Sequence, residues 1–255
     1  MNTLSVAGGA LRYEFLMQFR RRSIWLVLAL VSMLSAVFWL AFLIGPQATA
    51  LDAVMYLAQF TAWFLPLGVG LVLADRLARD KKLRVDEILD SFPGSLGARL
   101  FGKYLGSTLA TLVPVALIYS AGLVYILARF HDPRSLLLAL GAFAAIPLPG
   151  MLFAAGFSIA LPALLKVPLY QILFIGYWFW ANLMSPRFKV PSLVGTMLNA
   201  TGPWAQEAFF HYQWVFLRLN PTVWQGVASI VLLVGLSFVA VCVAWLFLRW
   251  QRARR

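Results

Sequence analysis

The sequence predicts an all-α polytopic membrane protein with six transmembrane helices, folded as a single transmembrane domain over residues 1–255. Hydrophobic residues make up 62% of the chain and charged residues only 12%, and the mean hydropathy is +0.83. Apolar runs of about 20 residues recur along the chain, and each is long enough to cross roughly 30 Å of hydrocarbon at about 1.5 Å per residue. These runs must be helical, because lipid offers backbone groups no other hydrogen-bond partners.

The segment before the first apolar run, residues 11–22, predicts a short amphipathic helix. Leu11, Phe15 and Phe19 recur at i, i+4 and i+8, whereas Glu14 and Arg21 fall on the other side. Such a helix would lie in the inner headgroup layer with its polar side toward water. A simple basic flank to the first span explains the same residues equally well.

Six apolar runs define the expected spans. Prolines and a glycine interrupt the fourth run at Pro147, Pro149, Gly150 and Pro162, so we expect that span to be kinked or broken. A tight turn at Lys166 and Pro168 should then start the fifth. The expected spans are Ile24–Ile44, Ala53–Ala74, Leu105–Ala128, Leu136–Leu165, Val167–Met184 and Val227–Leu248.

The distribution of basic residues predicts that both termini are cytoplasmic. With that orientation, 16 of the 21 lysines and arginines lie inside and five lie outside. This bias follows the positive-inside rule, and an even number of spans agrees with it. The net charge of +12 is explained by topology and by anionic membrane lipids. Nucleic-acid binding is not expected, because the basic residues flank spans instead of forming one continuous face.

A polar segment, residues 75–103, separates the second and third spans and predicts a cytoplasmic docking element. Val85, Ile88, Leu89, Phe92 and Leu96 form an apolar ridge opposite acidic residues. A helix of this kind fits a groove on a soluble partner, although a helix resting passively on the lipid surface has the same pattern. The stretch Gly97–Lys103 matches G-x-x-x-x-G-K, but Tyr104 replaces the required Ser or Thr, so no nucleotide site is expected there.

The expected spans contain no Asp, Glu, Lys, Arg or His in their interiors. Ion-coupled transporters and intramembrane proteases rely on such groups at membrane depth, so both classes are disfavoured. Milder polar residues either join helices to one another or line a substrate path. The candidates for the path are Gln59, Thr61, Thr111, Ser120, Gln171 and Asn182. The single cysteine, Cys242, and two separate histidines predict no metal site.

The order of these features resembles the membrane subunit of an ATP-binding-cassette transporter of the type-2 exporter class. The resemblance rests on Glu87, Leu89, Ser91, Pro93 and Ser95 in the polar loop, followed by Gly102 and Lys103 at the start of the third span. It implies that a coupling helix contacts a separate cytoplasmic ATPase subunit, and that each transporter holds two membrane subunits. The implied contact residues are Asp86, Glu87, Ile88, Leu89, Asp90, Ser91, Phe92, Pro93, Gly94 and Ser95.

The external loop, residues 185–225, is long and rich in apolar residues, which a solvated loop would not need. The resembled family has short, partly re-entrant helices between spans five and six, which here could be Ser192–Asn199 and Ala205–Leu217. An aromatic belt at the membrane interface would have a similar composition.

The expected function is therefore that of a permease subunit, which is not itself an enzyme. It would move an amphipathic, lipid-like or drug-like substrate, with ATP and magnesium bound only by the partner subunit and no cofactor in this chain. The expected partners are the ATPase subunit, a second permease copy or a paralogue, and membrane lipids, in a bacterial or archaeal plasma membrane. A membrane-embedded lipid-modifying enzyme or assembly factor is the main alternative, followed by an ion-coupled secondary transporter.

Overall fold

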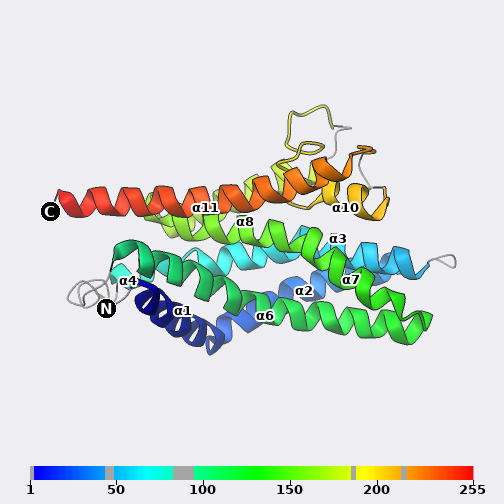
Figure 1. The fold of residues 1–255 in the computed structure, drawn as a ribbon, viewed down its shortest axis with the longest axis horizontal. Coiled ribbons are helices and arrows are strands. Elements are labelled where there is room, and N and C mark those ends of the chain that lie inside the picture. The colour runs from blue at the N-terminus through cyan, green and yellow to red at the C-terminus, as the bar shows by residue number, and fades with distance from the viewer. Residues whose placement is uncertain (1–2, 44–48, 83–94, 185–187, 214–216, 255) are drawn as a thin grey trace.

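The computed structural model of the chain describes residues 3–43, 49–82, 95–184, 188–213 and 217–254 (Figure 1). These residues form helices and turns, with no strand among them, which confirms the all-α prediction. The main helices are α1 (Thr3–Phe19), α2 (Arg22–Leu43), α3 (Ala50–Leu73), α4 (Arg76–Lys82), α6 (Leu96–Phe130), α7 (Arg134–Ala145), α8 (Pro147–Ala160), α9 (Val167–Trp178), α10 (Pro203–Phe210) and α11 (Val223–Ala253). A 3₁₀ turn, η1 (Leu161–Ala163), follows α8, and a π-helical stretch, η2 (Phe179–Leu183), follows α9.

Among the described residues, five helical segments are long and apolar enough to cross a membrane, which identifies the chain as an integral membrane protein. They are Arg22–Ala41, Ala50–Arg79, Leu96–Phe130, Arg134–Ala163 and Val223–Ala253. The expected fifth span corresponds to α9 and η2, which together run from Val167 to Leu183. These 17 residues cover about 25 Å at 1.5 Å per residue, slightly less than a typical hydrocarbon core.

Helix α3 is the central helix of the bundle. Nearly every residue from Ala53 to Leu73 is buried, and α3 contacts α2, α6, α7, α8 and α9. By contrast, α2 and α11 each leave a broad apolar face exposed, including Leu26 at 68% and Val231 at 63%. Exposed apolar faces of this kind suit contact with lipid tails. The indole N–H groups of Trp39 and Trp178 donate to carbonyl oxygens of α3 and so tie their segments to the central helix.

The expected interruption of the fourth span is confirmed. Helix α7 ends at Ala145 and α8 begins at Pro147, with Ile146 between them at φ −105° and ψ −72°. Proline lacks an N–H and its ring clashes with the carbonyl four residues earlier, so the helix cannot continue straight through Pro147. Helices α3 and α6 contact both arms of this bend, α7 and α8.

Helix α1 packs against the start of α6, with a buried face that differs from the predicted one. Its polar residues Glu14 and Gln18 are 5% and 0% exposed, whereas Tyr13 and Leu16 are exposed. A Cβ on Gly102 would lie 2.7 Å from the carbonyl oxygen of Ala7, so the two helices touch through their backbones. A helix is present here as expected, but it runs from Thr3 to Phe19 instead of over residues 11–22, and Glu14 faces α6 instead of water. Its expected place in the headgroup layer stays a prediction.

The elements that were expected on the cytoplasmic side lie together at one end of the bundle. Helices α1 and α4, the start of α6 and the end of α11 lie at this end in Figure 1, which we call the α4 end. Helix α10 and the turn between α6 and α7 lie at the other end, which we call the α10 end. The chain thus separates the basic segments around α4 and the C-terminus from the less basic loops around α10.

Candidate functional site

The proposed docking segment falls almost entirely outside the described residues. The residues outside the described part of the chain are Asp86, Glu87, Ile88, Leu89, Asp90, Ser91, Phe92, Pro93 and Gly94. Ser95 is described, and it caps the N-terminus of α6, where its Oγ accepts a hydrogen bond from the backbone N–H of Ala98 at 3.2 Å. The cap fixes the point at which the chain re-enters the bundle.

An ion pair lies on the N-terminal side of the docking segment, where α3 passes into α4. The guanidinium of Arg21 donates to both oxygens of Asp75, at 3.1 and 2.7 Å. Arg76 is 1% exposed, and its Nε lies 3.3 Å from the same carboxylate. Bidentate arginine–carboxylate pairs are among the stronger charged contacts and fix geometry as well as energy. The end of α3 is therefore tied to the turn between α1 and α2.

A second ion pair, on the C-terminal side of the docking segment, joins α1 to α6. Lys103 Nζ lies 2.6 Å from Glu14 Oε1, and both side chains are less than 10% exposed. We use the term ion network for the five residues Glu14, Arg21, Asp75, Arg76 and Lys103. The sequence did not predict it, although Gly102 and Gly106 form a G-x-x-x-G pattern that is typical of close helix packing.

The apparent phosphate-binding stretch Gly97–Lys103 is the first part of α6. Gly97 packs beside the indole of Trp245, Gly102 beside Ala7, and Lys103 beside Glu14. A phosphate loop needs backbone N–H groups that are free to converge on an anion, and here they belong to a regular helix. Residues 97–103 are therefore part of a packed helix and not a loop.

The six candidate substrate-path residues are not brought together in one cavity. Gln59 and Thr61 are buried within α3, and Thr111 donates to the carbonyl of Thr108 in its own helix. Ser120 is exposed on the outer surface of α6. Gln171 donates to the carbonyl of Leu71 at 3.2 Å and so joins α9 to α3. Gln171 thus joins one helix to another, which is one of the two roles expected of these residues.

Asn182 organises the polar connection between η2 and the chain before α10. Its side-chain oxygen accepts from the backbone N–H of Ala200 at 2.7 Å, and its own backbone carbonyl accepts from Asn199. Asn199 in turn accepts from the backbone N–H and the hydroxyl of Thr201. All three side chains are buried. Residues 192–199, expected to be helical, form turns instead, and the expected helix 205–217 is the shorter α10.

Replacing Asn182 with leucine is expected to lower the free energy of unfolding by about 1–3 kcal/mol, because the buried N–H of Ala200 loses its acceptor. The measurement is unfolding of the purified protein in mixed detergent micelles. Ser120→Ala provides the control, since Ser120 is exposed and its loss should change stability by less than about 0.5 kcal/mol. Equal stability of the two variants would contradict the role assigned to Asn182.

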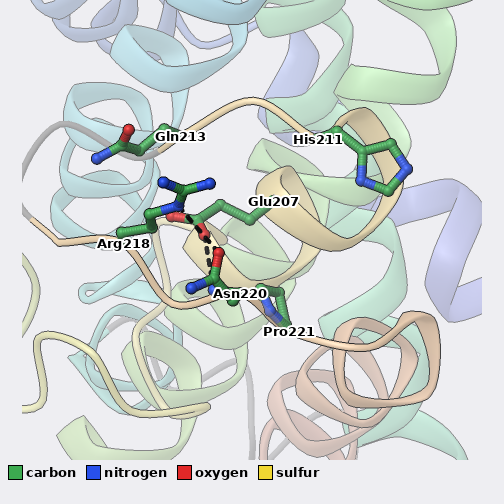
Figure 2. A pocket seen from close by; sticks show the side chains of 6 residues that line it. All are labelled: Glu207, His211, Gln213, Arg218, Asn220 and Pro221. Atoms are coloured by element: carbon green, nitrogen blue, oxygen red, sulfur yellow. Dashed lines mark hydrogen bonds between the residues drawn. The ribbon is translucent and has the colours of Figure 1, made fainter.

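A polar pocket of about 300 Å³ lies at the α10 end of the bundle (Figure 2). Its lining includes Glu207, His211, Gln213, Arg218 and Asn220. Glu207 is 7% exposed and accepts from the backbone N–H groups of Leu219 and Asn220, at 2.9 and 3.0 Å. Arg218 donates to Asn220, whereas the imidazole of His211 lies apart from this group in Figure 2. The carboxylate of Glu207 therefore anchors the chain that leads into α11.

Tyr212 fastens the end of α10 to the beginning of α3. Its hydroxyl donates to Asp52 at 2.9 Å. Burial, and then hydrogen bonding with Tyr56 and Asp52, raises the pKa of Tyr212 well above its ordinary value, so the phenol remains the donor at physiological pH. Asp52 also completes a capping box with Thr49 at the start of α3. The α10 end is thus held by several polar contacts at once.

An apolar cavity of about 390 Å³ lies between α8, α9 and α11 and is covered by the turns at residues 193–198. The hydroxyls of Tyr170 and Tyr177 are the polar side-chain groups among its lining residues, and Tyr170 is hydrogen-bonded to Ser158 at 2.7 Å. A smaller cavity of about 190 Å³ adjoins it and shares Phe157, Leu161 and Leu236 as walls. The larger cavity is within the usual size range of small-molecule sites. None of the six candidate substrate-path residues lines either cavity.

Comparison of the chain with protein-family models, with curated proteins and with solved structures found no match.

Proposed function

We propose that this chain is the permease subunit of an ATP-driven exporter of the ATP-binding-cassette class. In this proposal α9 and η2 form the fifth of six crossings, and the α4 end faces the cytoplasm. A separate ATPase subunit, which binds ATP and magnesium, contacts residues 86–95, and a second copy or a paralogue completes the transporter. The observation that carries the proposal is the ion network, which braces both flanks of that segment.

The bracing gives a physical route from a cytoplasmic partner to the membrane helices. On one flank, Asp75 connects α3 to the turn before α2 through Arg21. On the other, Lys103 connects α6 to α1 through Glu14. Because α3 is the central helix, a displacement of the segment between α4 and α6 would reach most of the bundle as a rigid-body movement. This arrangement supports a coupling role better than a passive resting place on lipid.

The positions of the charged residues support an external source of energy. In the described parts of the spans, ionisable side chains cluster near the helix ends, as with Asp52, Asp75, Lys103 and Arg129. An ion-coupled transporter would need such groups at the middle of the membrane. The apolar cavity suits an amphipathic or lipid-like substrate, which is the class that we propose.

A lipid-modifying enzyme is the second candidate, and the polar pocket at the α10 end is the observation in its favour. Glu207, His211 and Arg218 are residue types that catalyse group transfer and hydrolysis. However, Glu207 is already held by two backbone N–H groups, which is what an anchoring carboxylate does. The pocket therefore supports catalysis less well than the ion network supports coupling.

Gentle purification of the chain from the membranes of its own host tests the proposal. We expect an ATPase subunit to copurify, and we expect Leu89→Glu, in the docking segment, to remove it while the chain still folds and inserts. Val190→Glu is the matched control, because Val190 is 45% exposed and lies outside the docking segment, between η2 and α10. Purification of the chain alone, with transport unchanged by Leu89→Glu, would refute the permease function.

A further inference from the structure

The two adjoining apolar cavities form a groove that is elongated along the bundle. On the α8 side the larger cavity is lined by Phe153, Phe157 and Leu161, and the eight steps from Phe153 to Leu161 span about 12 Å at 1.5 Å per residue. On the α9 side it is lined from Leu165, just before the helix, to Tyr177. The groove is open toward lipid, because Leu173 is 53% exposed. Its shape and lining fit a hydrocarbon chain that lies parallel to the helices.

The smaller cavity gives the groove a second arm. It is lined by Leu161, Leu164 and residues of α11 that include Val239 and Val243, both at least half exposed. Phe157, Leu161 and Leu236 stand between the two arms as a shared wall. Two apolar arms that diverge from a common wall match the two acyl chains of one phospholipid.

Basic residues lie near the groove where the two arms meet η1. Leu164 lines one arm, Leu165 lines the other, and the next residue is Lys166, which is exposed. Helix α4, which includes the partly exposed Arg79, contacts η1 at the same end. An anionic headgroup at this position would meet a positive field, as basic residues near a membrane surface generally provide.

We propose that the groove between α8, α9 and α11 binds one anionic diacyl phospholipid, with its headgroup at Lys166 and its two acyl chains in the two arms. The occupant belongs to the leaflet at the α4 end of the bundle. The site goes beyond the proposed permease function and holds whether or not an ATPase subunit binds to the chain. Lys166 supplies selectivity for the anionic headgroup, and the aliphatic walls supply most of the affinity.

Native mass spectrometry of the full chain in mild detergent tests the proposal. The probes are phosphatidylglycerol and phosphatidylcholine with identical acyl chains, and lysophosphatidylglycerol with one chain. We expect one phosphatidylglycerol per chain to be retained in preference to the other two lipids. Lys166→Gln should weaken phosphatidylglycerol binding about fivefold, the contribution of one lysine near an anionic surface. Lys189→Gln is the control, because Lys189 is also exposed but lies between η2 and α10 and lines neither cavity, so it should leave binding unchanged.

A filled-groove variant tests the apolar arms separately. Leu173→Trp places a larger side chain in the groove from a position that is already half exposed, and it should abolish retention of phosphatidylglycerol. Ile172→Trp is the matched control, because Ile172 is the adjacent residue, is 70% exposed and does not line the groove. Equal retention of the charged and uncharged diacyl lipids, or equal effects of the two tryptophan variants, would show ordinary surface lipid only and overturn the proposal. Equal retention of the one-chain lipid would overturn the two-arm assignment.

Discussion

Replacing Lys103 with methionine is expected to lower the free energy of unfolding by about 3–5 kcal/mol, the usual cost of removing one partner from a buried ion pair. Glu14 is 5% exposed and lies 2.6 Å from Lys103, so the substitution leaves a carboxylate in the contact between α1 and α6 with its nearest cation removed. The measurement is unfolding of the purified chain in mixed detergent micelles, followed by far-ultraviolet circular dichroism. We also expect α1 to become accessible to protease before the rest of the bundle unfolds.

The double variant Glu14→Gln, Lys103→Met is the control for this prediction. It removes both charges, so most of the stability lost in Lys103→Met should return. The difference between the double variant and the two single variants measures the coupling between the side chains. If the double variant is as unstable as the sum of the single variants, the pair contributes no coupling, and the brace on the α6 flank of the docking segment is absent.

The apolar runs and proline positions were enough to predict five spans and the break near Pro147. Both depend on local properties: a continuous apolar run must be a helix in lipid, and proline cannot continue one without a bend. The predicted fifth span also begins where expected, at Val167, because Pro168 favours the first turn of a helix. The length of α9 and η2 relative to the membrane depends on where η2 ends, near Asn182. Local sequence does not determine that end.

The ion network was not predictable from the same local patterns. In α1, the ridge of Leu11, Phe15 and Phe19 indicates a helix with an apolar side toward lipid, and such a ridge does not show what lies on the polar side. The partner of Glu14 is Lys103, which is 89 positions away along the chain. Only the G-x-x-x-G pattern at Gly102 and Gly106 indicates that another helix approaches there.

The polar residues within the spans illustrate the same limit. Gln171 and Asn182 were expected to join helices or to line a path, and the sequence could not separate these roles. Gln171 donates to a carbonyl of α3, and Asn182 accepts from the backbone of the chain before α10. In lipid a polar side chain gains most by pairing with another polar group, and the choice of partner is set by tertiary packing.

Replacing Gly150 with alanine is expected to displace the turn before α10 and to lower the free energy of unfolding by about 1–3 kcal/mol through overpacking. A Cβ on Gly150 would overlap the carbonyl oxygen of Ala200, which is a backbone atom and cannot rotate aside. Ala200 can move only by lengthening its hydrogen bond to Asn182. The measurement combines unfolding in mixed micelles with limited proteolysis of residues 188–213, where cleavage should become faster.

Gly235→Ala separates this steric effect from the effect of alanine on helix propensity. Gly235 lies within α11 and has open space where a Cβ would be added. Alanine favours a helix over glycine by about 1 kcal/mol, so this variant should be as stable as the natural chain or slightly more stable. Gly150 also lies in a helix and would gain the same propensity, so a loss of stability there must come from the contact with Ala200. If Gly150→Ala and Gly235→Ala change stability alike, the turn at Ala200 is not held against α8 in the folded protein.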